Sequence, residues 1–198
     1  MTADKTMTTT DDLSIPFSDV ALSRRLERAE GQGCADYVES RAKLYPESDA
    51  CWIEVAGAYA MYDGLRSPLT QTFGLGVFEP VGHSELDRIE EFYRERGAPV
   101  FHEVSPLADP ALLALFAERG YHPIELTSVL FRPIRPGINF TKSSNDTMRV
   151  RLSREDEHEL WARTATKGWS EFTEVADQIF DLSMVGAKRP GAASFFAE

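Results

Sequence analysis

Strand-like and helix-like patterns alternate over residues 71–132 with little sequence between them, which restricts the chain to folds that mix both elements closely. The range Gln71–Phe78 predicts a first strand. Ser84-Glu85-Leu86-Asp87 has the form of a capping box, so we expect a helix to begin at Ser84 and to end at Gly97. Pro99–Val104 then predicts a second short strand.

A second helix and a third strand complete this alternation. Asp109 followed by Pro110 is typical of a helix start, because a proline at the first helical position loses no needed hydrogen bond. Gly120 supplies the matching helix end, and Ile124–Arg132 predicts the last strand. The order β-α-β-α-β therefore predicts an α/β fold.

The segment before this unit contains further predicted helices and strands. Phe17–Ala29 and Gly33–Leu44 have the pattern of two amphipathic helices, separated by a break at Gly31-Gln32-Gly33. Cys51–Tyr62 is rich in strand-forming residues, and Asp63-Gly64 is a tight-turn signal. We therefore expect two helices followed by a hairpin.

The element order, together with Leu115-Phe116-Ala117-Glu118-Arg119-Gly120-Tyr121, resembles the GCN5-related N-acetyltransferase family. In that family a late helix carries a similar pattern that ends in glycine, followed by an aromatic residue that opens the next strand. The resemblance covers residues 50–132 and implies a mixed central sheet flanked by helices. On this basis residues 13–132 form one acetyltransferase-like domain of degenerate type, and residues 1–12 form a disordered polar lead-in.

A second start of the same kind follows a Pro-, Gly-, Ser- and Asn-rich linker at residues 133–147. Met148–Leu152 predicts a strand, and Ser153-Arg154-Glu155-Asp156 predicts a capped helix that runs to Gly168. Phe172–Val185 predicts another helix, and Ser194–Glu198 predicts the opening of a next strand. Strand followed by two helices is how the family's domain begins, so residues 148–198 resemble an incomplete second repeat, in a fragment or in a naturally shortened protein.

The aromatic residues of this second part, Trp161, Trp169 and Phe172, have spacings compatible with an apolar helix stripe. Without the sheet that should cover it, such a stripe tends to bind a partner, to exchange between chains or to aggregate. We therefore expect self-association through the incomplete repeat.

The resemblance implies acyl transfer from acetyl-CoA, as cosubstrate, to a small-molecule amine. In the family the cofactor's pyrophosphate binds the turn between a strand and the following helix, which corresponds here to Val81, Gly82, His83 and Ser84. The string Gln71-Thr72-Phe73-Gly74-Leu75-Gly76 matches the family's cofactor signature in its letters, but it falls inside the predicted strand and before the turn.

Catalysis of this kind needs a base and an oxyanion donor, and often a tyrosine that protonates the leaving thiolate. Phe116 stands where the family's helix carries that tyrosine. Glu79, His102 and Glu103 are candidate bases, and the alternation of a strand places His102 and Glu103 on opposite faces. No catalytic residue is assigned. Two interpretations stay open: an acetyltransferase whose activity belongs to the intact two-repeat form, with this chain inactive alone, or a non-catalytic binding or scaffold module with the same fold.

Composition narrows the class of protein further. A net charge of −11 and a pI near 4.9 oppose a nucleic-acid-binding role, which relies on clustered Lys and Arg. No apolar run approaches a membrane span and the amino terminus lacks a secretory core, so we expect a cytoplasmic protein. Cys34 and Cys51 lack metal-site spacing and are expected to be thiols, with a disulfide as the minority alternative. The four histidines form no metal-binding pattern.

Overall fold

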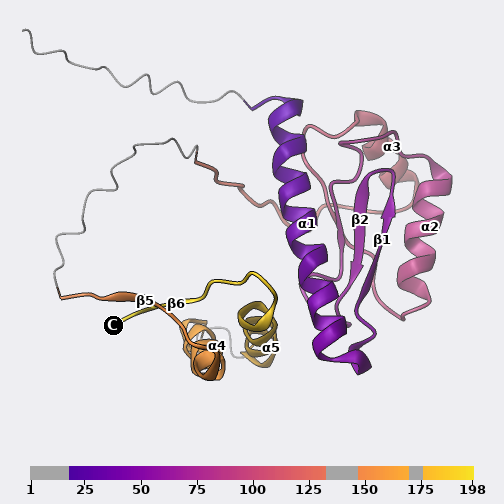
Figure 1. The fold of residues 1–198 in the computed structure, drawn as a ribbon. Coiled ribbons are helices and arrows are strands. Elements are labelled where there is room, and N and C mark those ends of the chain that lie inside the picture. The colour runs from indigo at the N-terminus through magenta and orange to yellow at the C-terminus, as the bar shows by residue number, and fades with distance from the viewer. Residues whose placement is uncertain (1–17, 133–146, 170–175) are drawn as a thin grey trace, which may run out of the picture.

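A computed structural model describes residues 18–132, 147–169 and 176–198 of the chain (Figure 1). The lead-in predicted at residues 1–12 and nearly all of the linker predicted at residues 133–147 lie outside the described residues. The first unit contains, in order, α1 (Val20–Leu44), a short 3-10 helix (Pro46–Ser48), β1 (Cys51–Val55), β2 (Ala58–Tyr62), β3 (Thr72–Phe73), α2 (His83–Arg94), β4 (His102–Glu103) and α3 (Pro110–Glu118).

The four strands of this unit form one mixed sheet in the order β1-β2-β3-β4. β1, β2 and β3 are antiparallel neighbours, whereas β3 and β4 run parallel, as strands joined by a crossover helix do. The predicted α/β class is therefore confirmed, with a small mixed sheet flanked by helices.

Each face of the sheet is covered by a helical layer (Figure 1). α1 packs on one face, where Val38 of the helix meets Tyr59 and Met61 of β2. α2 and α3 cover the opposite face, where Leu86 and Leu112 join a larger buried cluster. The two apolar clusters lie on opposite sides of the sheet, so this unit has three layers.

The break predicted at residues 31–33 is wrong, because α1 is one continuous helix from Val20 to Leu44. Gly31 instead lies where the helix crosses Tyr59: a Cβ atom added at Gly31 would be 2.6 Å from the ring carbon Cδ2 of Tyr59. The glycine allows close packing of helix on sheet, which outweighs its modest helix-breaking tendency.

Cys51–Tyr62, predicted as one strand-rich segment, is itself a two-stranded hairpin. Its turn is Ala56-Gly57, where both residues have positive φ (50° and 73°), as a two-residue hairpin loop requires. The turn predicted at Asp63-Gly64 begins a longer loop that leads to β3, which pairs antiparallel with β2.

The predicted strand Gln71–Phe78 is much shorter in the structure, because β3 ends at Phe73. Gly74 and Gly76 follow with φ of +77° and +73°, a left-handed conformation that turns the chain out of the sheet. Likewise, only two residues of the predicted strand Pro99–Val104 pair with β3.

The ends of α2 and α3 agree with the predictions, except for the start of α2. α2 begins after Gly82 rather than at Ser84, because Glu85, not Asp87, supplies the capping carboxylate. The helix start at Asp109 is confirmed: its Oδ1 accepts a hydrogen bond from the N–H of Ala111 at 2.9 Å. Gly97 and Gly120 follow α2 and α3 with positive φ, as predicted for helix ends.

The third strand predicted at Ile124–Arg132 is wrong for this structure, since none of its residues lies in a strand. Every residue from 122 to 132 is exposed. A strand forms only when a neighbour accepts its backbone hydrogen bonds, and no such neighbour lies beside this segment in the described part of the chain.

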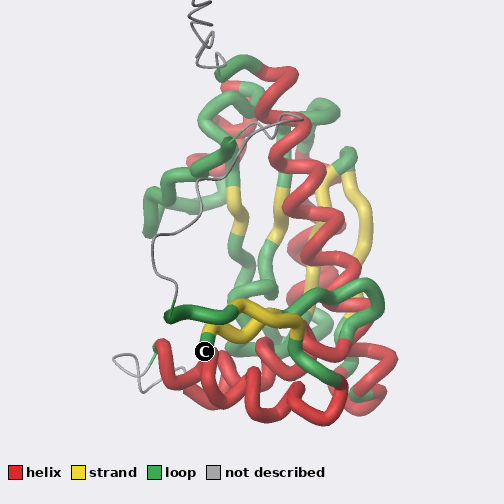
Figure 2. Tube along the Cα trace, turned by 60° about the vertical axis from the view of Figure 1, so that its left-hand side comes forward, coloured by secondary structure: helices red, strands yellow, loops and turns green. Residues whose placement is uncertain are grey.

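The second unit consists of β5 (Val150–Leu152), a short 3-10 helix (Glu155–Glu157), α4 (His158–Gly168), α5 (Ala176–Lys188) and β6 (Phe195–Ala197). The strands predicted near residues 148 and 195 are thus confirmed, and they pair antiparallel against the two helices (Figure 2). The helix predicted at Phe172–Val185 corresponds to α5, and Phe172 itself lies outside the described residues. Glu157 caps the helical turn through the N–H of Arg154, later than the predicted capping box.

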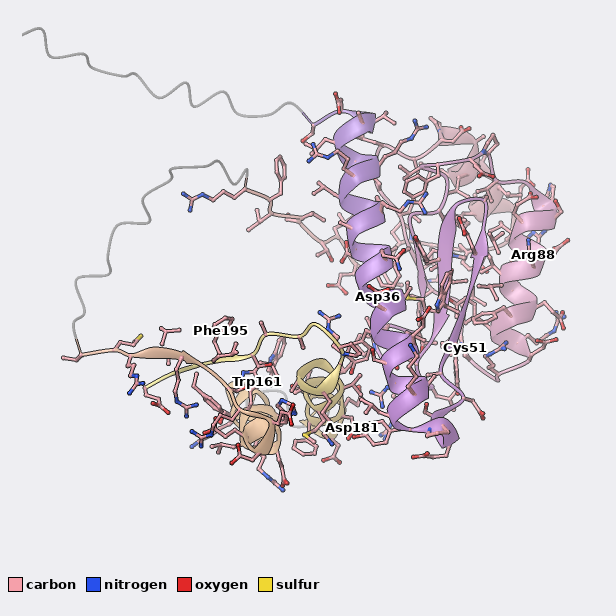
Figure 3. All side chains as sticks on the ribbon, in the orientation of Figure 1. Asp36, Cys51, Arg88, Trp161, Asp181 and Phe195 are labelled. Atoms are coloured by element: carbon pink, nitrogen blue, oxygen red, sulfur yellow. The ribbon has the colours of Figure 1, made fainter. Side chains whose placement is uncertain are left out.

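α5 of the second unit lies beside α1 of the first (Figure 3), and hydrogen bonds join the two helices' surroundings there. Tyr37 of α1 donates its hydroxyl hydrogen to the carbonyl oxygen of Leu182 in α5 at 2.8 Å. Arg189, just after α5, reaches the carbonyl oxygen of Gly33 at 3.4 Å. α1 therefore contacts the sheet with one side and α5 with another.

Two glycines of α1 provide a matched test of the close packing. We expect Gly31→Ala to destabilise the protein by about 1–3 kcal/mol, because the new methyl group would clash with the Tyr59 ring. Gly33→Ala should stabilise it by about 0.5–1 kcal/mol, since no heavy atom lies within 4 Å of its added Cβ. Urea unfolding measures both values, and equal effects at the two positions would contradict this account.

Candidate functional site

The predicted cofactor turn, Val81-Gly82-His83-Ser84, lies at the amino-terminal end of α2. Gly82 is the N-cap residue, and His83 and Ser84 form the exposed start of the first turn. Backbone N–H groups at this end of a helix are free of intrahelical partners, and the helix dipole favours a negative charge there. The position is therefore suited to bind an anion.

A carboxylate of the chain itself already occupies this position. The N–H of Gly82 donates to Oε2 of Glu85 at 2.9 Å, and the hydroxyl of Ser84 donates to both oxygens of Glu85 at 3.0 Å. The hydrogen bond from Gly82, followed by that from Ser84, lowers the pKa of Glu85 below its usual value. A pyrophosphate would have to displace this carboxylate, so the turn fits acetyl-CoA poorly in this conformation.

A cation beside the turn, Arg119, is also engaged. Arg119, which follows α3, donates to Glu90 at 2.9 Å and lies 2.7 Å from the carboxylate of Asp87. Its other terminal nitrogen lies 3.3 Å from both Nδ1 and the carbonyl oxygen of His83. This guanidinium fastens the end of α3 to the start of α2 and is shared among several acceptors, which limits its use for phosphate.

Gly74 and Gly76, in the string Gln71–Gly76, allow close packing in the interior. A Cβ atom at Gly74 would lie 2.8 Å from the Phe78 ring, and one at Gly76 would lie 2.7 Å from Cδ2 of Leu112. Both glycines are buried. They form the bend after β3, away from the amino-terminal end of α2, and the string is not part of the predicted cofactor turn.

The candidate bases do not converge. Glu79 is exposed in the loop before α2. His102 stacks on Phe116, with ring centroids 4.8 Å apart, and contacts Tyr121 edge-on at 5.0 Å. Glu103 projects from the other face of β4, where Nε2 of Gln71 lies 3.5 Å from its carboxylate. The structure therefore agrees with the prediction that His102 and Glu103 face opposite sides.

His102 has the environment of a core residue. Neither of its ring nitrogens has a hydrogen-bond partner, and burial lowers its pKa to about 4. The ring is therefore neutral at pH 7 and contributes aromatic packing. Phe116 is buried beside it, and the hydroxyl of Tyr121 donates to Glu90 at 3.1 Å, on the side of the sheet that α2 covers.

A group of carboxylates that the sequence analysis missed lies between α1 and β4. Burial, followed by repulsion from Glu103 and Glu30, raises the pKa of Glu27 to about 7. The pKa of Glu103 is raised by burial and then by Glu30 and Glu125. Glu27 and Glu30 are three residues apart on one helix face, a spacing visible in the sequence, but their approach to Glu103 depends on how α1 crosses the sheet.

A cavity of about 190 Å³ lies between the two units, lined by residues of α1, the loop after β2, and α5. Its most buried group is Asp63, which pairs with Arg41 and accepts a hydrogen bond from Ser67 at 2.6 Å. Burial raises the pKa of Asp63 above its ordinary value. These charges neutralise one another, so the cavity presents no free charged group from this pair.

The cysteines are free thiols, as the main prediction stated. Burial raises the pKa of Cys34 to about 11, so this sulfur is protonated at pH 7 and is a poor nucleophile. In the described ranges 18–132, 147–169 and 176–198, no group of three or more His, Cys, Asp or Glu side chains is arranged to hold a metal ion. None of the helices in those ranges is both long and apolar enough to cross a membrane.

Comparison of the chain with protein-family models, curated proteins and solved structures finds no match. The geometry above is therefore the basis for a functional proposal.

Glu27 makes the stability of the fold depend on pH. Its folded pKa of about 7 exceeds the ordinary value of 4.5, so its contribution is most favourable below pH 4.5 and is lost as pH rises towards 7. We expect Glu27→Gln to stabilise the protein at pH 8, by on the order of 1 kcal/mol after allowing for solvent screening, and to lose this advantage near pH 4.5.

Urea unfolding at several pH values measures this difference between Glu27→Gln and the unchanged chain. Glu47→Gln, in the exposed 3-10 turn after α1, is the control for loss of one negative charge. A stabilisation by Glu27→Gln that stays the same from pH 4.5 to pH 8 would contradict the assignment.

Proposed function

We propose that residues 18–132 form a non-catalytic domain of the acetyltransferase type, and that acyl transfer from acetyl-CoA to an amine belongs to a protein with two complete repeats of this fold. The order β3-α2-β4-α3, with β3 and β4 parallel, supports the resemblance to the GCN5-related N-acetyltransferases. The Gly82–Glu85 hydrogen bond at 2.9 Å carries the proposal that this domain itself does not catalyse the transfer.

This hydrogen bond matters because the amino-terminal end of a helix can stabilise one anion well. When the Glu85 carboxylate occupies that position, its negative charge repels a phosphate group. The N–H of Gly82 is then also already used as a hydrogen-bond donor. A Cβ atom at Gly82 would lie 3.2 Å from Oε2 of Glu85, so the local backbone and the carboxylate are closely fitted. The turn is thus stable without a ligand.

The chemistry of the transfer also lacks its usual groups in this domain. An amine attacks the thioester carbonyl only after it loses a proton, and the departing thiolate then takes up a proton. His102 is partly buried against the rings of Phe116 and Tyr121, and Phe116 has no ionisable proton. Tyr121 directs its hydroxyl to Glu90. These residues can stabilise the domain but cannot assist both proton transfers.

The second candidate is a scaffold role without any acyl transfer. The contact of Tyr37 with Leu182, together with the reach of Arg189 to Gly33, favours it, because α1 offers a surface on which the α4–α5 pair docks. This role is compatible with the two-repeat proposal and remains if no acyl transfer is found. A two-repeat form that turns over acetyl-CoA would distinguish the acetyltransferase proposal from a scaffold alone.

Calorimetric titration with acetyl-CoA tests the proposed lack of a cofactor site. We expect no saturable binding to the unchanged chain up to about 1 mM, because Glu85 excludes the pyrophosphate. Glu85→Ala removes the competing charge, and we expect it to bind at least about tenfold more tightly than the unchanged chain. Saturable binding to the unchanged chain that is abolished by Gly82→Trp would show that the turn is a working cofactor site.

A further inference from the structure

α5 docks on α1 through polar contacts that lie beside a cavity. The hydroxyl of Tyr37 donates to the carbonyl oxygen of Leu182 at 2.8 Å, and Nη1 of Arg189 donates to the carbonyl oxygen of Gly33 at 3.4 Å. Leu182 and Asp181 of α5 also line the cavity of about 190 Å³ between the units. A close-packed core leaves few voids larger than a water molecule, so this contact has the character of an interface between units that can separate.

Arg189 brings a positive charge to an acidic part of the first unit. Its hydrogen bond reaches Gly33, and the next residue, Cys34, is four residues after Glu30, so Glu30 and Cys34 share one face of α1. Burial, followed by Glu30 and Glu103, raises the pKa of Cys34, whereas Arg189 lowers it. The two carboxylates and the guanidinium therefore lie near the same sulfur atom.

Carboxylates gather at this place in the first unit. Burial, followed by repulsion from Glu103 and Glu30, raises the pKa of Glu27. Burial, followed by repulsion from Glu30 and Glu125, raises the pKa of Glu103. Because these like charges repel one another, a cation that approaches from the second unit relieves part of the repulsion. Arg189 is placed to supply that cation.

The charge of Arg189 contributes more to docking than its hydrogen bond does. An N–H···O=C bond normally spans about 2.7–3.2 Å between nitrogen and oxygen, and the 3.4 Å from Arg189 to Gly33 is longer. Attraction between opposite charges weakens more slowly with distance than a hydrogen bond does. The side chain of Arg189 is half-buried, so its charge is screened less than a fully exposed one.

We propose that Arg189 is an electrostatic latch: its attraction to Glu30 and Glu103 holds α5 on α1, and salt releases the second unit reversibly. The described part of the connecting segment does not oppose release, since every residue from 122 to 132 is exposed. The latch involves neither the predicted cofactor turn nor acyl transfer, so it goes beyond the proposed function and does not depend on it.

Small-angle X-ray scattering of the full 198-residue chain, extrapolated to zero protein concentration, tests the latch. We expect the docked form at about 20 mM salt. At about 1 M salt the Debye length falls to roughly 3 Å, and we expect the radius of gyration to rise by about 2–4 Å. Arg189→Gln should show the larger radius already at low salt. Lys188→Gln, which removes the same charge from the exposed neighbouring residue, should behave as the unchanged chain.

Two results of this experiment would overturn the proposal. One is a radius of gyration of the unchanged chain that is the same at both salt concentrations, and the other is an Arg189→Gln variant that matches Lys188→Gln. Circular dichroism should show the same helix content in both variants. Loss of helix in Arg189→Gln alone also overturns the proposal, because the arginine would then stabilise the second unit itself rather than its docking.

A charge exchange separates the charge of Arg189 from its hydrogen bond. Arg189→Glu places a further carboxylate near Glu30 and Glu103, and we expect it to release the second unit at low salt. Glu30→Arg combined with Arg189→Glu restores an opposite pair and should return the radius of gyration to the docked value. Neither variant retains the donor to Gly33, so recovery depends on charge. Failure of the double variant to recover the docked radius overturns the latch.

Discussion

The packing of α1 across β2 is the contact on which both units of the structure depend. Gly31 lets the ring of Tyr59 lie against the helix backbone, and the hydroxyl of that ring accepts a hydrogen bond from Arg28 and donates one to Gln32, each at 3.1 Å. These contacts fix the position of α1 along the sheet and its rotation about its own axis. Further along the same helix, Tyr37 donates a hydrogen bond to Leu182 of α5. The position of α1 on the sheet therefore also determines the position of α5.

The opposite layer is anchored by a similar device. Tyr93 of α2 is fully buried, and its hydroxyl accepts from the N–H of Met61 at 3.1 Å and lies 3.3 Å from the hydroxyl of Thr72. It therefore satisfies polar groups at the point where the short strand β3 begins to pair with β2. Because α2 is held this way, its amino-terminal end has a fixed position, and Glu85 completes the helix there without a ligand.

Sequence patterns could predict those features that depend on neighbouring residues. Asp109 caps α3 because a carboxylate and a following proline act within one turn, and Gly97 ends α2 for an equally local reason. Gly31 was misjudged because its effect depends on Tyr59, which is distant in sequence. The same limit applies to the site: the turn before α2 was predicted, but its occupation by the Glu85 carboxylate depends on the N-cap residue being Gly82 rather than Ser84.

The carboxylates between α1 and β4 show how the fold accepts an unfavourable arrangement. Glu27 gains nothing from lying near Glu103 and Glu30, and burial adds to the cost of its charge. These carboxylates are held there because α1 is positioned by Tyr59 on one side and by α5 on the other. A helix fixed by apolar packing can thus hold acidic groups close together although they repel one another.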